Sequence, residues 1–251
     1  MVAARTVVVV LLVVLAGCGG FADGTDREPY GVDEPVDPEP EELLPGVTAD
    51  GVSDPEQLHA AHFDALEDDV YEQTTIRTTA DESGTVDSTV ITSETVGANG
   101  TPALVVVEHW EQAPENLTAD PTHEHRIWIT DGENYGKQVN DSGDVTHARN
   151  VSVGLLEPEP PAPPVEFYDR TDAVEEDGDR IHLEGAGDIW SYENASFTLS
   201  LTDAGYIERL QLDAEVGDRA VEETMVLETR EAFPLEEPEW VEEARAADEA
   251  E

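Results

Sequence analysis

The chain has 251 residues, enough for one large domain or two small ones, and its 12 basic against 59 acidic residues give a formal net charge of −47. A chain this acidic offers no basic surface for nucleic-acid phosphates and no cluster of Lys and Arg for an anionic membrane surface. Its single Cys excludes a disulfide framework and any zinc or iron–sulfur site built from several cysteines.

The acidic residues are spread along the whole chain, and Lys137 is the only Lys beside 11 Arg. High net charge is also typical of intrinsic disorder, but several segments of the chain alternate clearly between polar and apolar residues. Molar salt shortens the Debye length to about 3 Å, so it screens the self-repulsion of such a chain. We therefore interpret the sequence as that of a halophilic protein that needs molar salt to fold.

The N-terminus has the features of an export signal. Arg5 is followed by the unbroken apolar run Val7–Leu15, which is too short to span roughly 30 Å of hydrocarbon as a helix. We therefore predict that residues 1–17 are a signal peptide. The residues Leu15-Ala16-Gly17-Cys18 resemble the lipobox of secreted lipoproteins, whose Cys becomes the mature N-terminus and carries lipid. This resemblance implies that Cys18 is lipidated and anchors the protein at the outer face of the cytoplasmic membrane.

Residues 18–52 are predicted to be a disordered tether. Gly19–Val52 contains five prolines and ten acidic residues and has few apolar side chains to bury, so it should stay solvated and extended. Five Asn-x-Ser/Thr sequons along the chain agree with an exported protein. The predicted glycosylation sites are Asn99, Asn116, Asn140, Asn150 and Asn194.

A helix is predicted over Asp54–Asp69. Asp54 is placed to cap it, Pro55 suits the first helical position, and Gln57 completes a capping box. Apolar residues then recur at helical spacing. The helix should therefore present one apolar face to a partner.

After this helix the pattern changes to the period of two that is typical of half-buried strands. The proline-rich segment 157–164 breaks the pattern once, because five of its eight residues are Pro. We predict a single α+β domain over residues 53–245, followed by an acidic tail at 246–251, with an antiparallel sheet that has one apolar and one solvated face. The predicted strands are 70–79, 85–96, 103–110, 125–130, 133–139, 144–150, 180–184, 195–201, 206–216 and 219–231.

Two segments resemble a known family. The residues Trp128-Ile129-Thr130-Asp131-Gly132-Glu133-Asn134-Tyr135 look like a hairpin of haloarchaeal lipoproteins of unknown function, and Pro238–Ala244 looks like their terminal motif. These proteins in turn resemble the LolA and LppX class of lipoprotein carriers, whose curved sheet wraps helices around an apolar cavity. The resemblance implies a half-barrel packed on one or a few helices, although the proline-rich segment replaces helix that relatives carry between their two β halves.

No pattern in the sequence indicates an enzyme, because the chain has no G-x-S-x-G, no phosphate-binding Gly-rich loop and no H-E-x-x-H. The pairs His59/His62 and His123/His125 could share a face and, with carboxylates, bind zinc or copper. In a chain with 59 acidic residues some carboxylate lies near every His by chance, so we read these four as polar surface histidines. We expect no catalytic residue, no metal and no cofactor.

One helix of about 15 residues is roughly 22 Å long and about 10 Å wide, and cannot cover a sheet of eight strands that is about 38 Å across. We therefore expect a partly open apolar groove, bounded by the Asp54–Asp69 helix, that binds an apolar small molecule or lipid. The alternative is a structural or interaction lipoprotein of the cell envelope with a filled core. The predicted groove residues alternate within their strands and are assumed to share one face of the sheet; they are Val90, Leu104, Val106, Trp128, Phe197, Leu199, Leu201, Leu210 and Leu212.

The lipobox resemblance leads to a direct test at Cys18. Since the apolar run is too short to anchor the protein, Cys18→Ser should release the protein to the medium or leave its signal peptide uncleaved. Fractionation of cells and medium, with mass spectrometry of the N-terminus, measures both outcomes. A variant that is processed normally and stays in the membrane fraction would contradict lipidation at Cys18.

Overall fold

The computed structural model describes residues 41–111, 119–130, 132–151, 163–230 and 235–247, which belong to one unit that begins at Pro40. The predicted signal peptide, Cys18, Asn116 and the part of the proline-rich segment before Pro163 lie outside the described residues. Most of the predicted tether also lies outside them.

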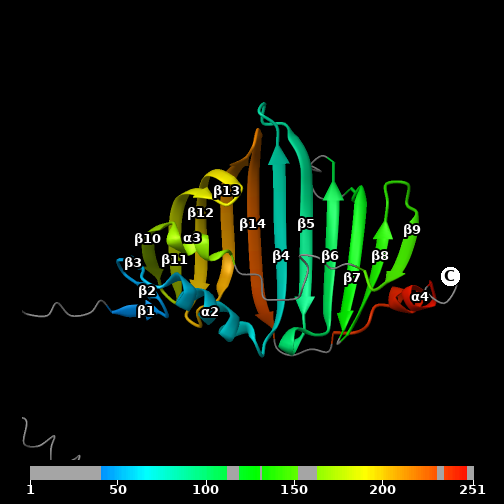
Figure 1. Cartoon of the computed structure of the whole chain (residues 1–251), viewed down its shortest axis with the longest axis horizontal. Coiled ribbons are helices and arrows are strands. Elements are labelled where there is room, and N and C mark those ends of the chain that lie inside the picture. The colour runs from blue at the N-terminus through cyan, green and yellow to red at the C-terminus, as the bar shows by residue number, and fades with distance from the viewer. Residues whose placement is uncertain (1–40, 112–118, 131, 152–162, 231–234, 248–251) are drawn as a thin grey trace, which may run out of the picture. The chain divides into compact units, whose positions relative to one another are not determined.

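An antiparallel sheet of eleven strands dominates the described part of the chain (Figure 1). It confirms the predicted α+β class with a large curved antiparallel sheet, and the sheet is open because β10 and β9 are its two edges. In spatial order the strands are β10 (Thr171–Asp177), β11 (Arg180–Ile189), β12 (Tyr192–Thr202), β13 (Ile207–Val216), β14 (Arg219–Arg230), β4 (Val70–Ala80), β5 (Val86–Val96), β6 (Ala103–Trp110), β7 (His123–Thr130), β8 (Glu133–Val139) and β9 (Val145–Arg149).

The sheet consists of two meanders joined in the middle. The chain runs outward from β4 to the edge strand β9, then crosses to the other edge and returns from β10 to β14. There β14 pairs with β4 along eleven residue pairs, from Ala220↔Ala80 to Arg230↔Val70. We call this junction the seam, and it joins segments that are about 150 residues apart in sequence.

The register defines two faces, because residues directly opposite on antiparallel strands point to the same side. The inner face carries Phe197, Leu199 and Leu210, and it packs against helices α2 (Pro55–Leu66) and α3 (Val165–Asp169). The outer face is the opposite side of the sheet. Figure 1 shows α2 and α3 together over the half of the sheet that runs from β10 to β14.

The helix α2 begins where the sequence predicts. The side chain of Asp54 accepts a hydrogen bond from the Gln57 amide at 3.0 Å, and Pro55 is the first helical residue. The helix ends at Leu66, three residues before the predicted end at Asp69. Among the described residues, no helix is long and apolar enough to cross a membrane.

The last residues of the predicted tether belong to the fold, so the predicted boundary at Val52 is wrong. Three short strands, β1 (Glu42–Leu44), β2 (Val47–Thr48) and β3 (Gly51–Val52), form a small antiparallel sheet. The side chains of Leu44 and Val47 are buried in the main core. A few apolar residues among many acids are therefore enough to fix this segment against the helices and β10.

A C-terminal helix, α4 (Trp240–Ala247), contacts β8 and β9 at the far end of the sheet from α2 (Figure 1). It includes Ala246 and Ala247, which the sequence assigns to an acidic tail, while residues 248–251 lie outside the described part. Val241 and Ala244 pack on Trp128 and Tyr135 of the outer face. The outer face is therefore not fully solvated, contrary to the prediction of one wet face.

Arg245 fastens α4 to the sheet. Its guanidinium donates to both carboxylate oxygens of Glu237, at 2.7 and 2.6 Å, and to the Tyr135 hydroxyl at 3.2 Å. The same guanidinium lies 4.9 Å from the centroid of the Tyr135 ring. A bidentate ion pair combined with a cation–π contact holds a short helix that its own length would not stabilise.

Gly185 lets α3 approach the sheet closely. A Cβ atom built on this residue of β11 would collide with the backbone carbonyl of Arg170, which follows α3, and with the ring of Phe197. Both neighbours lie in the packed interior, where a backbone atom has little room to move.

We expect Gly185→Ala to lower the free energy of unfolding by about 1–3 kcal/mol, because the methyl group forces α3 away from β11. Ala186→Ser, one residue away on the exposed outer face, is the matched control and should change stability by less than about 0.5 kcal/mol. Urea denaturation in molar salt measures both. Equal stabilities for the two variants would show that α3 is not packed as described.

Candidate functional site

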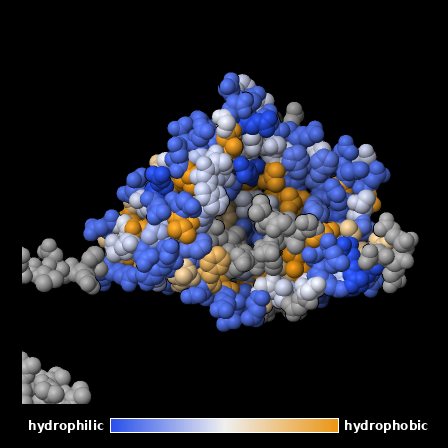
Figure 2. Space-filling view, in the orientation of Figure 1, coloured by the Kyte–Doolittle hydropathy of each residue, from blue (hydrophilic) through white to orange (hydrophobic). Residues whose placement is uncertain are grey.

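A groove of about 510 Å³ crosses the inner face at the seam. Its floor is formed by β13, β14 and β4, and one side is formed by α3 and the hairpin between β11 and β12. Figure 2 shows hydrophobic side chains gathered toward the hollow middle of this face, with hydrophilic ones around the periphery. A concave site of this size, lined by apolar groups with a few polar ones, is typical of small-molecule binding.

One side of the groove is apolar. Leu210 and Leu212 of β13 and Met225 of β14 point into it, as inward alternation on these strands requires. The ring of Phe167 in α3 lies above them and packs edge-to-face on Phe197, with ring centroids 5.0 Å apart. This wall continues the main hydrophobic core up to the seam.

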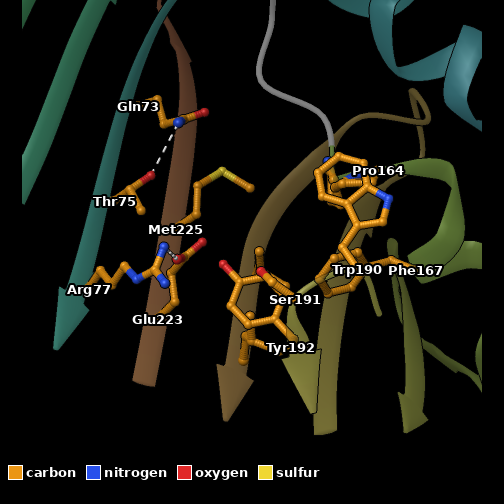
Figure 3. A pocket seen from close by; sticks show the side chains of 13 residues that line it. Gln73, Thr75, Arg77, Pro164, Phe167, Trp190, Ser191, Tyr192, Glu223 and Met225 are labelled. Atoms are coloured by element: carbon orange, nitrogen blue, oxygen red, sulfur yellow. Dashed lines mark hydrogen bonds and ion pairs between the residues drawn. The ribbon is translucent and has the colours of Figure 1, made fainter. Parts of the chain in front are cut away.

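The polar lining lies on β4 and at one end of the groove, where Glu223 of β14 and Tyr192 of β12 join it. Across the seam, inward Leu227, Met225 and Glu223 of β14 face inward Gln73, Thr75 and Arg77 of β4, respectively. The Gln73 amide donates to the Thr75 hydroxyl at 3.2 Å, as the close view shows (Figure 3). At Met225 and Leu227 the inner face therefore changes from apolar to polar within one strand spacing of about 4.8 Å.

An ion pair and an aromatic ring organise the polar side. Nη1 of Arg77 lies 3.9 Å from Oε2 of Glu223, and the guanidinium lies 5.6 Å from the centroid of the Tyr192 ring (Figure 3). These contacts fix the orientation of three polar side chains that line the groove.

Trp190 stands at the groove in an unusual conformation. It occupies the first turn residue of the β11–β12 hairpin with φ of 53°, a value that Gly or Asn adopts more readily than Trp. The residue is 71% exposed, yet it lines the groove together with Phe167 of α3. Backbone strain of this kind clusters at ligand-binding sites, so the conformation of Trp190 agrees with a functional role for it.

Two half-buried carboxyl groups lie on or next to the floor. Burial raises the pKa of Glu223, although Arg77 and Tyr192 oppose the shift. Burial also raises the pKa of Glu94, which lies directly opposite Gln73 on β5. The Oε1 atom of Gln73 is buried and has no hydrogen-bond partner among the described residues. Protonated Glu94 would supply a donor beside it.

The five predicted residues on β12 and β13 all lie on the inner face, but only two of them line the groove. These two are Leu210 and Leu212. Phe197 lies behind Phe167, and Leu199 and Leu201 are fully buried in the core. The part of the apolar face farthest from the seam is therefore filled, and the opening lies at the seam.

The other four predicted residues do not line this groove. Val90 is half-buried on the inner face of β5, whereas Leu104, Val106 and Trp128 point to the outer face. The assumption that all nine share one face is therefore wrong. The prediction failed because β6 and β7 contain uninterrupted apolar runs, and a run without alternation leaves open which residues point inward.

The predicted helix boundary of the groove is also wrong. Among the described residues that line it, none belongs to α2, and the helical wall comes from α3 instead. The sequence analysis missed Met225, the polar residues on β4 and β14, the hairpin residues Trp190, Ser191 and Tyr192, and Phe167 with the two prolines before α3. Every second residue of a strand points to the same side of the sheet, and Tyr71 of β4 is buried. Counting from it would have placed Gln73, Thr75 and Arg77 on the covered face.

Within the described ranges no group of three His, Cys, Asp or Glu residues could hold a metal ion. His62, which we expected on the surface, is fully buried, and its Nδ1 accepts a hydrogen bond from the Ile207 amide at 3.0 Å. His59 is half-buried, and burial lowers its pKa. The rings of His109 and His123 stack across β6 and β7.

The four sequons within the described residues lie at turns or at a strand end, where a glycan would have room. Asn99, Asn150 and Asn194 are exposed and have positive φ. Asn140 is half-buried, and its Oδ1 accepts from the amides of Ser142 and Asp144. Glycosylation at these positions stays a prediction.

Comparison with models of protein families finds no match, and comparison with the sequences of curated proteins finds none either. Comparison with solved structures finds a DUF1329 family protein from Desulfovibrio piger, at 9% identity and a TM-score of 0.32, covering 76% of this chain and 97% of that one. It also finds a β-barrel-like DUF1849 protein from Brucella abortus, at 11% identity and a TM-score of 0.25, covering 64% and 98%. Neither likeness is strong enough to support an inference about function.

The raised pKa of Glu94 predicts a pH-dependent effect on stability. Because the folded chain favours the protonated form, this carboxyl group stabilises the fold below about pH 4, and its contribution is lost as pH rises through the folded-state pKa. Glu94→Gln should therefore raise the free energy of unfolding at pH 7 and leave it unchanged near pH 4.

The control is Glu222→Gln, which removes the same charge from the exposed outer face of β14. Comparison of the two variants separates the effect of burying Glu94 from the stabilisation that the loss of any negative charge gives in this acidic chain. Urea titrations at several pH values measure the effect. If both variants gained the same stability at pH 7, burial of Glu94 would not be its cause.

Proposed function

We propose that this protein is a non-catalytic lipoprotein of a halophile that binds an apolar ligand or lipid in the groove at the seam. The observation that carries the proposal is the composition of the groove, with Leu210, Leu212 and Met225 on one side and Gln73 and Arg77 on the other. A ligand with an apolar body and one polar end matches such a boundary, because it would bury its apolar part without stripping water from its polar part.

Trp190 supports the same proposal. An exposed indole beside the apolar wall would contact an apolar ligand and bury its own surface in doing so. The volume of about 510 Å³ is within the range of small-molecule pockets and suits one ligand of modest size.

The cellular location in this proposal comes from the sequence. A signal peptide at 1–17 and lipidation of Cys18 would place the groove at the outer face of the cytoplasmic membrane, next to a source of lipid. This location, the halophilic setting and a carrier role like that of LolA and LppX proteins are parts of the proposal. The alternative, an envelope protein with a filled core, rests on the full burial of Leu199 and Leu201.

Binding of a neutral apolar fluorophore, N-phenyl-1-naphthylamine, to the protein in molar salt tests the proposal. We expect enhanced fluorescence with wild-type protein and a loss of affinity of about tenfold in Trp190→Gly, because the variant loses the indole contact. Glycine accepts the positive φ at this turn, so the variant should fold at least as stably as wild type.

Phe63→Ala is the control, since this half-buried aromatic side chain lies on α2 and does not line the groove. Its affinity for the fluorophore should equal that of wild type. Absence of binding to folded wild-type protein would favour the envelope protein with a filled core, and an equal loss in both variants would place the binding site elsewhere.

A further inference from the structure

Three basic side chains form a row on the outer face, on the side of the sheet opposite the groove. Arg126 of β7 is directly opposite Lys137 of β8, and Lys137 is directly opposite His147 of β9. Side chains in such positions have Cβ atoms about 4.5–5.5 Å apart, and the like charges of Arg126 and Lys137 destabilise the sheet there. A row of this kind in a chain with only 12 Lys and Arg residues calls for an explanation.

The residues at the two ends of the row, Arg126 and His147, already have carboxylate partners. Arg126 donates twice to Glu124, at 2.8 Å from both Nε and Nη2. Nε2 of His147 lies 3.4 Å from Oε2 of Glu243 in α4. Within the described residues Lys137 has no carboxylate partner, although the chain contains 59 acidic residues and most of its arginines form ion pairs.

Lys137 instead faces a second cavity. A space of about 760 Å³ lies between the outer face of β6–β9 and α4, and all three basic residues line it. Its apolar lining includes Leu104, Trp240 and Val145, and the Val145 side chain is 49% exposed. Trp190 and Val145 are the only large hydrophobic residues that are exposed in the described part of the chain. Trp190 lines the groove at the seam, and Val145 lines this cavity.

We propose that this cavity is a second binding site, for a small amphipathic anion that consists of an apolar chain with a single carboxylate or phosphate. The anionic group pairs with Lys137, and the apolar chain lies along Leu104, Val145 and Trp240. Glu239 and Glu243 also line the cavity, so the ligand carries little charge beyond the group that Lys137 neutralises. The site is independent of the groove at the seam, because the two lie on opposite faces.

Calorimetric titration in molar salt tests the site with octanoate and octyl phosphate as amphipathic anions. Octan-1-ol is the neutral probe of the same chain length, and acetate and inorganic phosphate are the head groups alone. All titrations use protein with Trp190→Gly, so that binding in the groove at the seam contributes little to the heat measured. An absence of binding at this cavity can then be told apart from an absence of binding in the groove.

We expect octanoate and octyl phosphate to bind at least tenfold more tightly than octan-1-ol and than the free head groups. Lys137→Gln should lower the affinity for both anions about tenfold and leave that for octan-1-ol unchanged. Arg209→Gln, which removes an exposed outer-face cation from β13, is the matched control and should bind as the parent does.

Three results would overturn the proposal. One is unchanged affinity for octanoate in Lys137→Gln, and another is an equal loss in Arg209→Gln, which would indicate a general effect of charge. The third is binding of acetate or phosphate as tight as that of the octyl compounds, which would identify a site for free inorganic or small organic anions instead.

Discussion

The pairing of β14 with β4 is the constraint on which the rest of the structure depends. Eleven residue pairs join two meanders that would otherwise be separate sheets with unpaired edges. The pairing brings together segments about 150 residues apart, so it requires the closure of a long loop before its hydrogen bonds form. It also decides which side chains meet on the inner face in the middle of the sheet, and therefore where the groove lies.

The groove is a consequence of what each partner brings to this pairing. At the seam, inward Met225 and Leu227 of β14 continue the apolar core, whereas the residues directly opposite them on β4 are Thr75 and Gln73. The helices α2 and α3 cover the apolar half of the inner face. This cover ends at α3 and Trp190, which line the groove. The fold buries a polar atom at this boundary, Oε1 of Gln73, which has no hydrogen-bond partner among the described residues and so destabilises the fold locally.

Both faces of the sheet carry apolar clusters, and this limits what strand alternation predicts. In β12 and β13 the outer face is solvated, so apolar and polar residues alternate along each strand. This alternation correctly predicted that Phe197, Leu199 and Leu210 lie on the covered side. In β6 and β7 the inner face belongs to the core, and Leu104 and Trp128 of the outer face pack in the cluster around α4. Residues that point to either side are therefore apolar, and no register follows from the sequence. The same loss of signal hid the row of Arg126, Lys137 and His147, which depends on alignment across three strands.

The sequence by itself determined the local elements: the helix capped by Asp54, nearly all the strands of the large sheet and the α+β class. These depend on residue spacing and on capping and turn chemistry within a few residues, which a single segment carries. Only the tertiary structure decided which strands are neighbours, which helix borders the groove and how the apolar residues divide between two faces. Those features depend on contacts between distant segments, and the pattern within one segment contains no information about the register of its partner.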